Sequence, residues 1–168
     1  AGLSALAEVG LGDLLALDED GGAVRVLEAL GASGLRVNRL WAPAASADEA
    51  VAAFARVAEW GAAAGVCRSL APLSDDDPTQ PSTGYADLRQ VALARLLVDN
   101  IDSIQVDWSR HGPKLAQVAL TFGADDLDAV PAESGEQGWR RAPREEVRRN
   151  IVAAGYTAVR RNGRFEAS

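Results

Sequence analysis

The sequence has 168 residues, a net charge of −7 and 48% hydrophobic residues, of which few are aromatic. This length is enough for one domain with a real core, and a hydrophobic content dominated by alanine and leucine favours helices packed on a sheet over an all-β sandwich. The acidic balance argues against a nucleic-acid or anionic-membrane surface, because both select clustered Lys and Arg.

Helical and strand-like segments alternate along the chain. Apolar residues at helical spacing predict helices, and short apolar or alternating runs predict strands. Ser46 with Glu49 forms a capping box at the start of one helix, and Asp99 with Asn100 is expected to cap another and to shape its turn. In chain order we predict a helix at 23–30, a strand at 35–41, a helix at 46–58, a strand at 66–70, a helix at 87–98, a strand at 104–108, a helix at 113–122, an acidic strand end near 128, a helix at 143–154 and a strand at 157–165 with a turn at Asn162.

These units recur about every 30 residues, which indicates an α/β fold with parallel strands and right-handed crossovers. An open doubly wound sheet and an arc of a (β/α) barrel both give this pattern. We treat residues 1–168 as a single domain, with repeat units over 1–130 and a basic helix and strand over 131–168. From Arg140 onward eight arginines accompany three glutamates, and we expect this segment to pair with the acidic body rather than to form a binding patch.

Single cysteine and histidine residues limit the chemistry of this chain. Cys67 alone excludes a disulfide framework, fits a reducing cytoplasm and is expected in the core. His111 alone excludes a histidine-based metal site or catalytic triad within the chain, and we expect it to be solvated. Asp75–Asp77 lies in a long predicted loop and is expected to be solvated rather than to bind a cation. No apolar run is long enough to span a bilayer, so we expect a soluble protein with no membrane contact.

Residues 96–128 carry the most specific pattern in the sequence. They read Leu-Leu-Val-Asp-Asn-Ile, then Ile-Gln-Val-Asp-Trp, Gly-Pro-Lys-Leu-Ala-Gln-Val-Ala-Leu and Phe-Gly-Ala-Asp-Asp-Leu-Asp. This succession resembles the radical S-adenosylmethionine enzymes of futalosine-dependent menaquinone biosynthesis, namely aminofutalosine synthase and dehypoxanthine futalosine cyclase, with deazaflavin synthase as a relative. Residues 82–89 and 144–164 extend the resemblance, which covers the second half of a family member. It implies half of a TIM-type (β/α) barrel.

The resemblance also shows what this chain lacks. The first half of such an enzyme carries three cysteines that hold a 4Fe-4S cluster with S-adenosylmethionine. Since Cys67 is the only cysteine here, the resemblance implies no cofactor within this chain and a cluster supplied by another chain or segment. Trp41–Pro43 stands where the family usually has a Gly-His pair, and Pro72 with Leu73 where it usually has a histidine. Two polar groups on the substrate side are therefore replaced.

Candidate binding residues follow from the rule that functional side chains of barrels lie at the C-terminal ends of strands. They are Asn38, Arg68, Gln105, Asp107 and Asp125, the last with its neighbour Asp126. Arg68 suits either a substrate carboxylate or an ion pair with the following loop. Gln105 and Asp107 share one face of their strand, which the resemblance places inside the barrel. Asp125 suits either a ligand or the backbone N–H groups of its own turn.

A half barrel leaves two strand edges and an inner wall that need a partner, so we expect a cluster-bearing half barrel or self-association. The resemblance implies that a futalosine-type nucleoside lies across the strand ends near Arg68, Gln105 and Asp107. On this hypothesis the chain is the substrate-side half of a radical S-adenosylmethionine homologue and is not catalytic alone. The alternative is a cluster-free binding or assembly partner. A third hypothesis is an enzyme with unrelated chemistry on the same scaffold.

Overall fold

In this computed structural model, residues 13–18, 22–73, 83–131 and 143–167 are described. Their strands form one parallel sheet in the order β1-β2-β3-β4-β5. The strands are β1 (Asp13–Asp18), β2 (Arg36–Trp41), β3 (Cys67–Ala71), β4 (Ser103–Asp107) and β5 (Asp126–Asp128). The helices are α2 (Ala23–Ala32), α3 (Ala47–Glu59), the 3-10 helix η1 (Gly61–Val66), α4 (Gly84–Leu97), α5 (Trp108–Thr121) and α6 (Pro143–Ala153).

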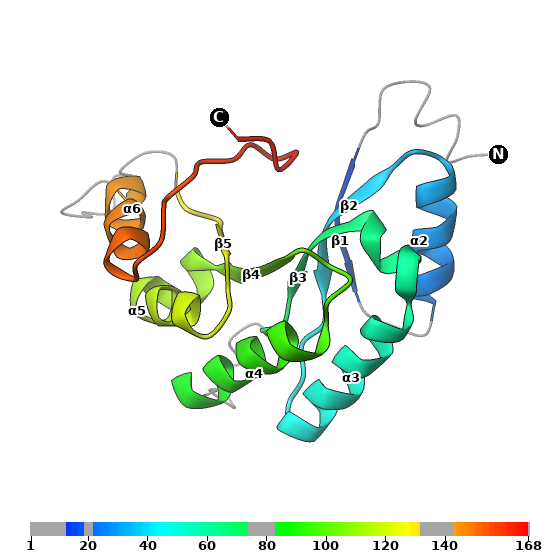
Figure 1. The fold of residues 1–168 in the computed structure, drawn as a ribbon, viewed down its shortest axis with the longest axis horizontal. Helices are drawn as coiled ribbons and strands as arrows, with labels where there is room; N and C mark the ends of the chain where they lie inside the picture. Colours follow the sequence, from blue (N-terminus) through cyan, green and yellow to red (C-terminus); the bar gives the residue numbers. More distant parts are fainter. Residues whose placement is uncertain (1–12, 19–21, 74–82, 132–142, 168) are drawn as a thin grey trace.

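The strand order decides between the two architectures that the repeat pattern left open. Each strand pairs with the next one in the sequence, so every right-handed crossover advances in the same direction. A doubly wound sheet would reverse the order partway and carry helices on both faces. Figure 1 instead shows α2, α3, α4 and α5 arranged around one side of the sheet. Because β1 and β5 do not pair with each other, the described residues form an arc of a (β/α) barrel that is not closed, which confirms the predicted fold class.

The start of α3 follows the predicted capping box. Ser46 Oγ accepts a hydrogen bond from the backbone N–H of Glu49 at 3.2 Å, and the Glu49 carboxylate accepts one from the N–H of Ala45 at 3.0 Å. These bonds satisfy N–H groups that have no partner within the helix. At the other end of α3, the Asn100 side chain donates to the carbonyls of Val57 and Ala58. Asn100 therefore caps α3 rather than its own helix α4.

The start of α5 lies earlier than the predicted start at Pro113. Asp107 caps an additional turn that begins at Trp108, and Gly112 joins this turn to the main helix. Gly112 has a φ of 76°, a conformation that glycine adopts at low cost. The sequence pattern located the main helix, and the aspartate cap adds the turn before it.

The predicted strand at 157–165 does not form, and this expectation was wrong. The described C-terminal residues contain only an isolated antiparallel bridge between Arg161 and Ala167. The predicted turn at Asn162 is present, because its N–H donates to the carbonyl of Glu166 at 2.9 Å. The segment bonds to side chains on one face of the sheet instead of to a strand edge. Strand β1 was not predicted, and Asp75–Asp77 lies outside the described residues.

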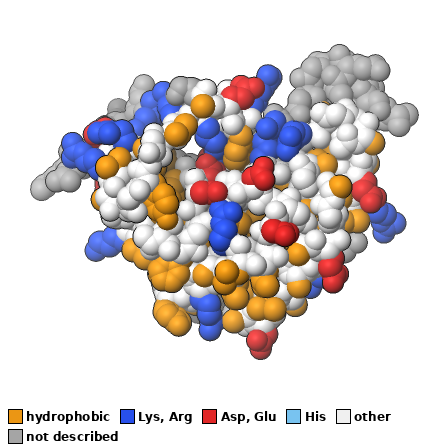
Figure 2. Space-filling model, in the orientation of Figure 1, with side chains coloured by type: hydrophobic (Ala, Val, Ile, Leu, Met, Phe, Trp, Pro, Cys, Tyr) orange, Lys and Arg blue, Asp and Glu red, His pale blue; other side chains and the backbone are white. Residues whose placement is uncertain are grey.

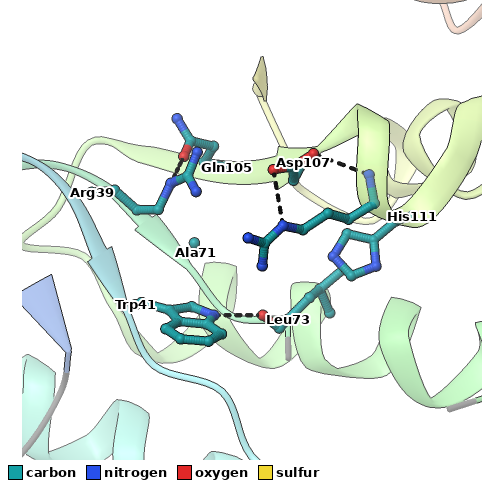
Figure 3. Close-up of a pocket in the computed structure, with 8 residues that line it drawn as sticks. Arg39, Trp41, Ala71, Leu73, Gln105, Asp107 and His111 are labelled. Atoms are coloured by element: carbon teal, nitrogen blue, oxygen red, sulfur yellow. Dashed lines mark hydrogen bonds and ion pairs between the residues drawn. The ribbon is translucent and has the colours of Figure 1, made fainter. Parts of the chain in front are cut away.

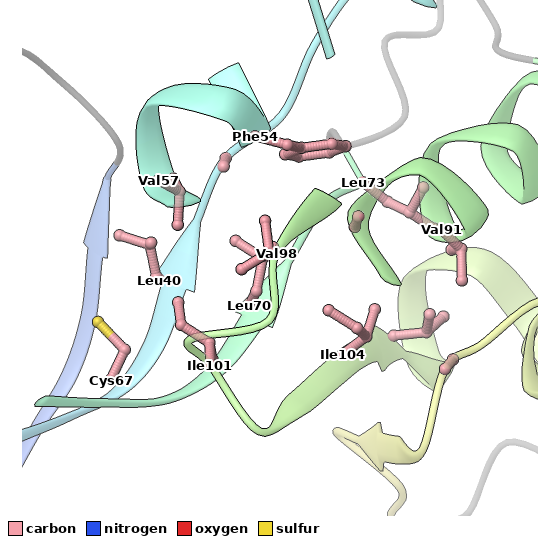
Figure 4. Packing of buried hydrophobic residues seen from close by; sticks show 14 of the residues in the cluster. Leu40, Phe54, Val57, Cys67, Leu70, Leu73, Val91, Val98, Ile101 and Ile104 are labelled. Carbon is pink, nitrogen blue, oxygen red and sulfur yellow. The ribbon is translucent and has the colours of Figure 1, made fainter. Parts of the chain in front are cut away.

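The hydrophobic core lies between the sheet and the helices that cover it (Figure 4). Leu40, Leu70 and Ile104 from the strands and Phe54 from α3 are fully buried. Burial of one such side chain contributes roughly 1.5–3 kcal/mol, so this layer determines the stability of the sheet. Cys67 is buried here as predicted, and burial raises the pKa of its thiol from 9.0 to about 12.

The opposite face of the sheet is polar, and we call it the polar face. Ile104 and Val106 of β4 belong to the core, so Gln105 and Asp107 point to the other face, because side chains alternate along a strand. Arg39 of β2 reaches Gln105 by a hydrogen bond and therefore shares this face. The polar face is the concave side of the arc, where a barrel would be filled.

The outer surface of the helices carries exposed hydrophobic side chains as well as charges. Leu96 and Tyr85 on α4 are 80% and 77% exposed. Figure 2 shows hydrophobic side chains gathered over the lower part of the view, where α3 and α4 lie in Figure 1. No helix in the described part of the chain combines the length and the apolar character needed to cross a membrane.

Candidate functional site

A pocket opens at the C-terminal ends of β2, β3 and β4 (Figure 3). Trp41, Ala71 and Asp107 are the last residues of these strands. The residues that line the pocket are Arg39, Trp41, Ala71, Leu73, Gln105, Asp107, Arg110 and His111. Functional side chains of (β/α) barrels gather at this end of the strands, so this pocket is the candidate site.

Hydrogen bonds to the backbone fix the orientation of Asp107 and Trp41. Asp107 Oδ1 accepts from the N–H groups of Ser109 and Arg110, at 2.9 and 3.1 Å, and thereby caps α5. Its other oxygen lies 3.6 Å from Nε of Arg110, which balances its charge. Trp41 Nε1 donates to the carbonyl of Leu73 at 2.8 Å, so the indole presents a fixed flat surface to the pocket.

Gln105 connects the pocket to a network of charged side chains on the polar face. The amide of Gln105, only 2% exposed, accepts a hydrogen bond from Arg39 and donates one to Asp126. Arg39 also forms an ion pair with Asp128. Arg161, from the C-terminal segment, donates to both oxygens of Asp126 at 2.6 Å and to Asp128 at 3.3 Å. Burial by itself lowers the pKa of Arg161, but the hydrogen bonds and charges of the two carboxylates outweigh burial and raise it above its ordinary value.

Two of the predicted site residues, Gln105 and Asp107, meet in this pocket. Both lie on the concave side, as the resemblance implied. Asn38, Arg68 and Asp125 are not among the described residues that line it. Binding of a substrate by any of these five residues stays a prediction.

Asn38 and Asp125 have structural contacts instead. Asn38 donates to the carbonyl of Gly163 in the C-terminal segment at 2.9 Å. Asp125 accepts from the backbone N–H of Ile104 at 2.8 Å and pairs with Arg95 at 2.8 Å. Asp125 therefore ties the start of β5 to the start of β4, rather than bonding to the N–H groups of its own turn.

Sequence reasoning missed Arg39, Trp41 and Arg161. For the first two a signal existed, since they are a charged and a large aromatic residue near the C-terminal end of their strand. For Arg161 the sequence predicted only that the basic C-terminal segment pairs with the acidic body. The ion pair between Arg161 and Asp126 confirms this. His111, which was expected to be solvated, is half-buried and lines the pocket.

The residues present do not fit an iron-sulfur cluster. In the described part of the chain, no three His, Cys, Asp or Glu side chains are placed to hold a metal ion. Cys67 is the only cysteine in the sequence. It is buried in the core, and its raised pKa keeps the thiol protonated, whereas a cluster is bound by thiolates.

The pocket is small, and aromatic, charged and amide side chains line it. Its volume is about 180 Å³, whereas pockets that enclose a drug-sized ligand have about 300–1,000 Å³. This space suits one ring or sugar of a larger molecule. The indole of Trp41 offers a stacking surface and Arg39 a cationic edge.

Comparisons with known proteins identify relatives that are longer than this chain. Residues 76–168 match the family described as the CofH/MqnC C-terminal region. Aminodeoxyfutalosine synthase of Streptomyces coelicolor is 37% identical over 95 residues, which are 52% of this chain and 24% of that enzyme. Cyclic dehypoxanthine futalosine synthase of the same organism is 33% identical over 89 residues, 51% of this chain and 22% of that enzyme. A 5-amino-6-(D-ribitylamino)uracil–L-tyrosine 4-hydroxyphenyl transferase of Methanoculleus marisnigri is 52% identical over 46 residues, 27% of this chain and 12% of that enzyme. The matched region spans at most about a quarter of each of these relatives.

Proposed function

The chain belongs to the CofH/MqnC C-terminal region family, and on this basis we propose that it is the substrate-side half of a radical S-adenosylmethionine homologue of futalosine-dependent menaquinone biosynthesis. Its role is to bind a futalosine-type nucleoside at the C-terminal ends of the strands. The cluster and S-adenosylmethionine come from another chain or segment. The chain has no catalytic activity alone.

The observation that carries this proposal is the position of the pocket. Three neighbouring parallel strands end at it, and the two predicted site residues Gln105 and Asp107 are among the strand residues that line it. A pocket of about 180 Å³ holds one ring of the nucleoside, and we place that ring against Trp41. The rest of the nucleoside then extends over the concave side, where a second barrel half would cover it.

The open sheet supports an external source of the cluster. In the described residues β1 pairs with β2 alone and β5 with β4 alone, so both edges are available for further strands. Cys67 is buried and protonated and offers no thiolate. A cluster at the mouth of the barrel therefore requires cysteines from outside this chain.

Calorimetric titration with futalosine tests the binding role. Stacking of a ring on an aromatic side chain contributes about 1–3 kcal/mol, so Trp41→Ala should weaken binding about fivefold or more. Tyr85→Ala is the matched control, because Tyr85 is exposed on α4 and does not line the pocket. Equal affinities of the two variants, or no saturable binding by the wild-type chain, would contradict a nucleoside site at Trp41.

The second candidate function is a cluster-free binding or assembly partner derived from the same family. Trp41 and Leu73 favour it, because they line the pocket where the resemblance predicts histidines. The loss of those polar groups would remove substrate contacts while leaving the scaffold intact. Iron analysis of the assembled complex separates the two functions.

A further inference from the structure

The C-terminal segment after α6 crosses the polar face of the sheet. Figure 1 shows it running from α6 over β5 and β4 toward β2. Tyr156 fixes its beginning by donating to the carbonyl of Leu120 at 3.2 Å, directly after Gly155, which has a φ of 89°. Near its end, the carbonyl of Gly163 accepts a hydrogen bond from Asn38 of β2. Residues 157–167, which we call the strap, therefore cover side chains that would otherwise face the inside of the barrel.

One side chain makes the charged contacts between the strap and the sheet. Arg161 donates two hydrogen bonds to Asp126 and a third to Asp128. Its guanidinium stacks on the ring of Phe165, 3.9 Å from the ring centre, which holds the guanidinium flat. Paired hydrogen bonds of a guanidinium to a carboxylate are specific and directional. Arg161 is therefore placed to act as a latch.

The strap has little else that holds it in place. The core cluster of buried residues contains Val147 of α6 but no residue of the strap. Val159 is 68% exposed, so the strap does not bury the apolar surface that fixes most segments. The turn at its tip is self-contained, since Asn162 Oδ1 accepts from the N–H groups of Arg164 and Glu166. Such a segment can detach from the sheet and lose its own turn without unfolding the core.

The polar face keeps hydrogen-bond partners when the strap leaves. Asp126 also accepts from Gln105, and Asp128 is also paired with Arg39. Neither carboxylate would become an isolated buried charge, which is the state that makes the loss of an ion-pair partner so costly. The network is therefore compatible with two arrangements, with and without Arg161.

We propose that residues 157–167 form a releasable strap over the polar face, with Arg161 as its latch. With the latch closed, Asp126 is covered and only 11% of its side chain is exposed. Release of the strap exposes Asp126, Asp128 and Gln105 beside the pocket while the core stays folded. The strap therefore controls access to the concave side, and this holds whichever ligand or partner that side binds.

Hydrogen–deuterium exchange of the full chain, followed by mass spectrometry, tests the latch. Hydrogen bonds to charged groups contribute about 1.5–3 kcal/mol each. Arg161→Ala should therefore accelerate about tenfold or more the exchange of the strap amides that are hydrogen-bonded within the turn, with β2 to β4 unchanged. These are the amides of Asn162, Arg164, Phe165 and Glu166. Arg160→Ala is the matched control, because it removes the same charge from the adjacent, exposed position. Equal exchange of the strap in both variants would overturn the latch. Faster exchange throughout the sheet in Arg161→Ala would overturn independent release.

The wild-type chain provides a second test that does not depend on the folding of a variant. Because salt screens ion pairs, exchange of residues 157–167 should rise about threefold or more between low salt and about 1 M NaCl, whereas exchange of the core helices should not. In Arg161→Ala this salt dependence should disappear. Salt-independent exchange of the wild-type strap would overturn an electrostatic latch.

Discussion

Replacing Gln105 by leucine tests whether the network of charged side chains on the polar face stabilises the fold. Gln105 is almost fully buried and uses both ends of its amide, accepting from Arg39 and donating to Asp126. Leucine has a similar size but makes no hydrogen bond. The substitution therefore leaves a cation and a carboxylate each with one partner fewer in a partly buried place.

The expected cost follows from these two contacts. Hydrogen bonds to charged groups contribute about 1.5–3 kcal/mol each. The apolar side chain of leucine recovers part of this loss, roughly 1–2 kcal/mol, by its own burial. We expect the free energy of unfolding to fall by about 2–4 kcal/mol, which lowers Tm by roughly 5–12 °C in a domain of this size.

Urea and thermal unfolding of Gln105→Leu measure this loss, with Gln90→Leu as the matched control. Gln90 is also buried, but it makes a single neutral hydrogen bond, to the carbonyl of Ala44 at 2.7 Å. In the described structure its Oε1 has no hydrogen-bond partner, so leucine there should cost about 1 kcal/mol or less. Equal losses in the two variants would refute a structural role for the charged network.

Three further substitutions test local features of the fold. Ser46→Ala should lower the free energy of unfolding by about 1 kcal/mol through loss of the α3 cap, and an unchanged urea midpoint would contradict this. Gly123→Ala should lower the free energy of unfolding by about 2 kcal/mol or more, because the backbone there has a φ of 112° and the added Cβ would lie 2.7 Å from Cβ of Arg95. Gly155→Ala should lower it by less, because φ is also positive there but no atom lies within 4 Å of the added Cβ. Cys67 has a folded pKa of about 12 against 9.0, so the native state keeps a proton that the unfolded state loses. Stability should therefore fall as pH rises from about 9 to 12, and Cys67→Ala should have a shallower slope.

The sequence predicted those helices and strands whose ends are set by contacts between residues close together in the chain. The helix that becomes α3 was predicted from Ser46 and Glu49 because a capping box is a contact between near neighbours. Strand β4 was predicted from the apolar pair Ile104 and Val106, and its alternation placed Gln105 and Asp107 on one shared face, which the resemblance assigned to the inside of the barrel. The resemblance then selected the barrel arc, which periodicity alone left undecided.

Residues joined over long sequence separations were not predictable in the same way. Arg39 and Gln105 are 66 positions apart, and Asp126 meets Arg161 across 35 positions. Their pairing depends on which strands are neighbours and on where the C-terminal segment crosses the sheet. The predicted strand at 157–165 was wrong for this reason. Arg161 bonds to side chains on the face of the sheet, and the segment does not pair along the edge of the sheet.

Iron and sulfide analysis of a reconstituted complex tests the central claim most directly. The chain should be co-expressed with a polypeptide that carries the family's three cysteines and then purified anaerobically. A substrate-side half barrel predicts a stable brown complex with four irons and four sulfides for each copy of this chain. A colourless homodimer of this chain that leaves the cysteine-bearing polypeptide unbound would contradict the claim.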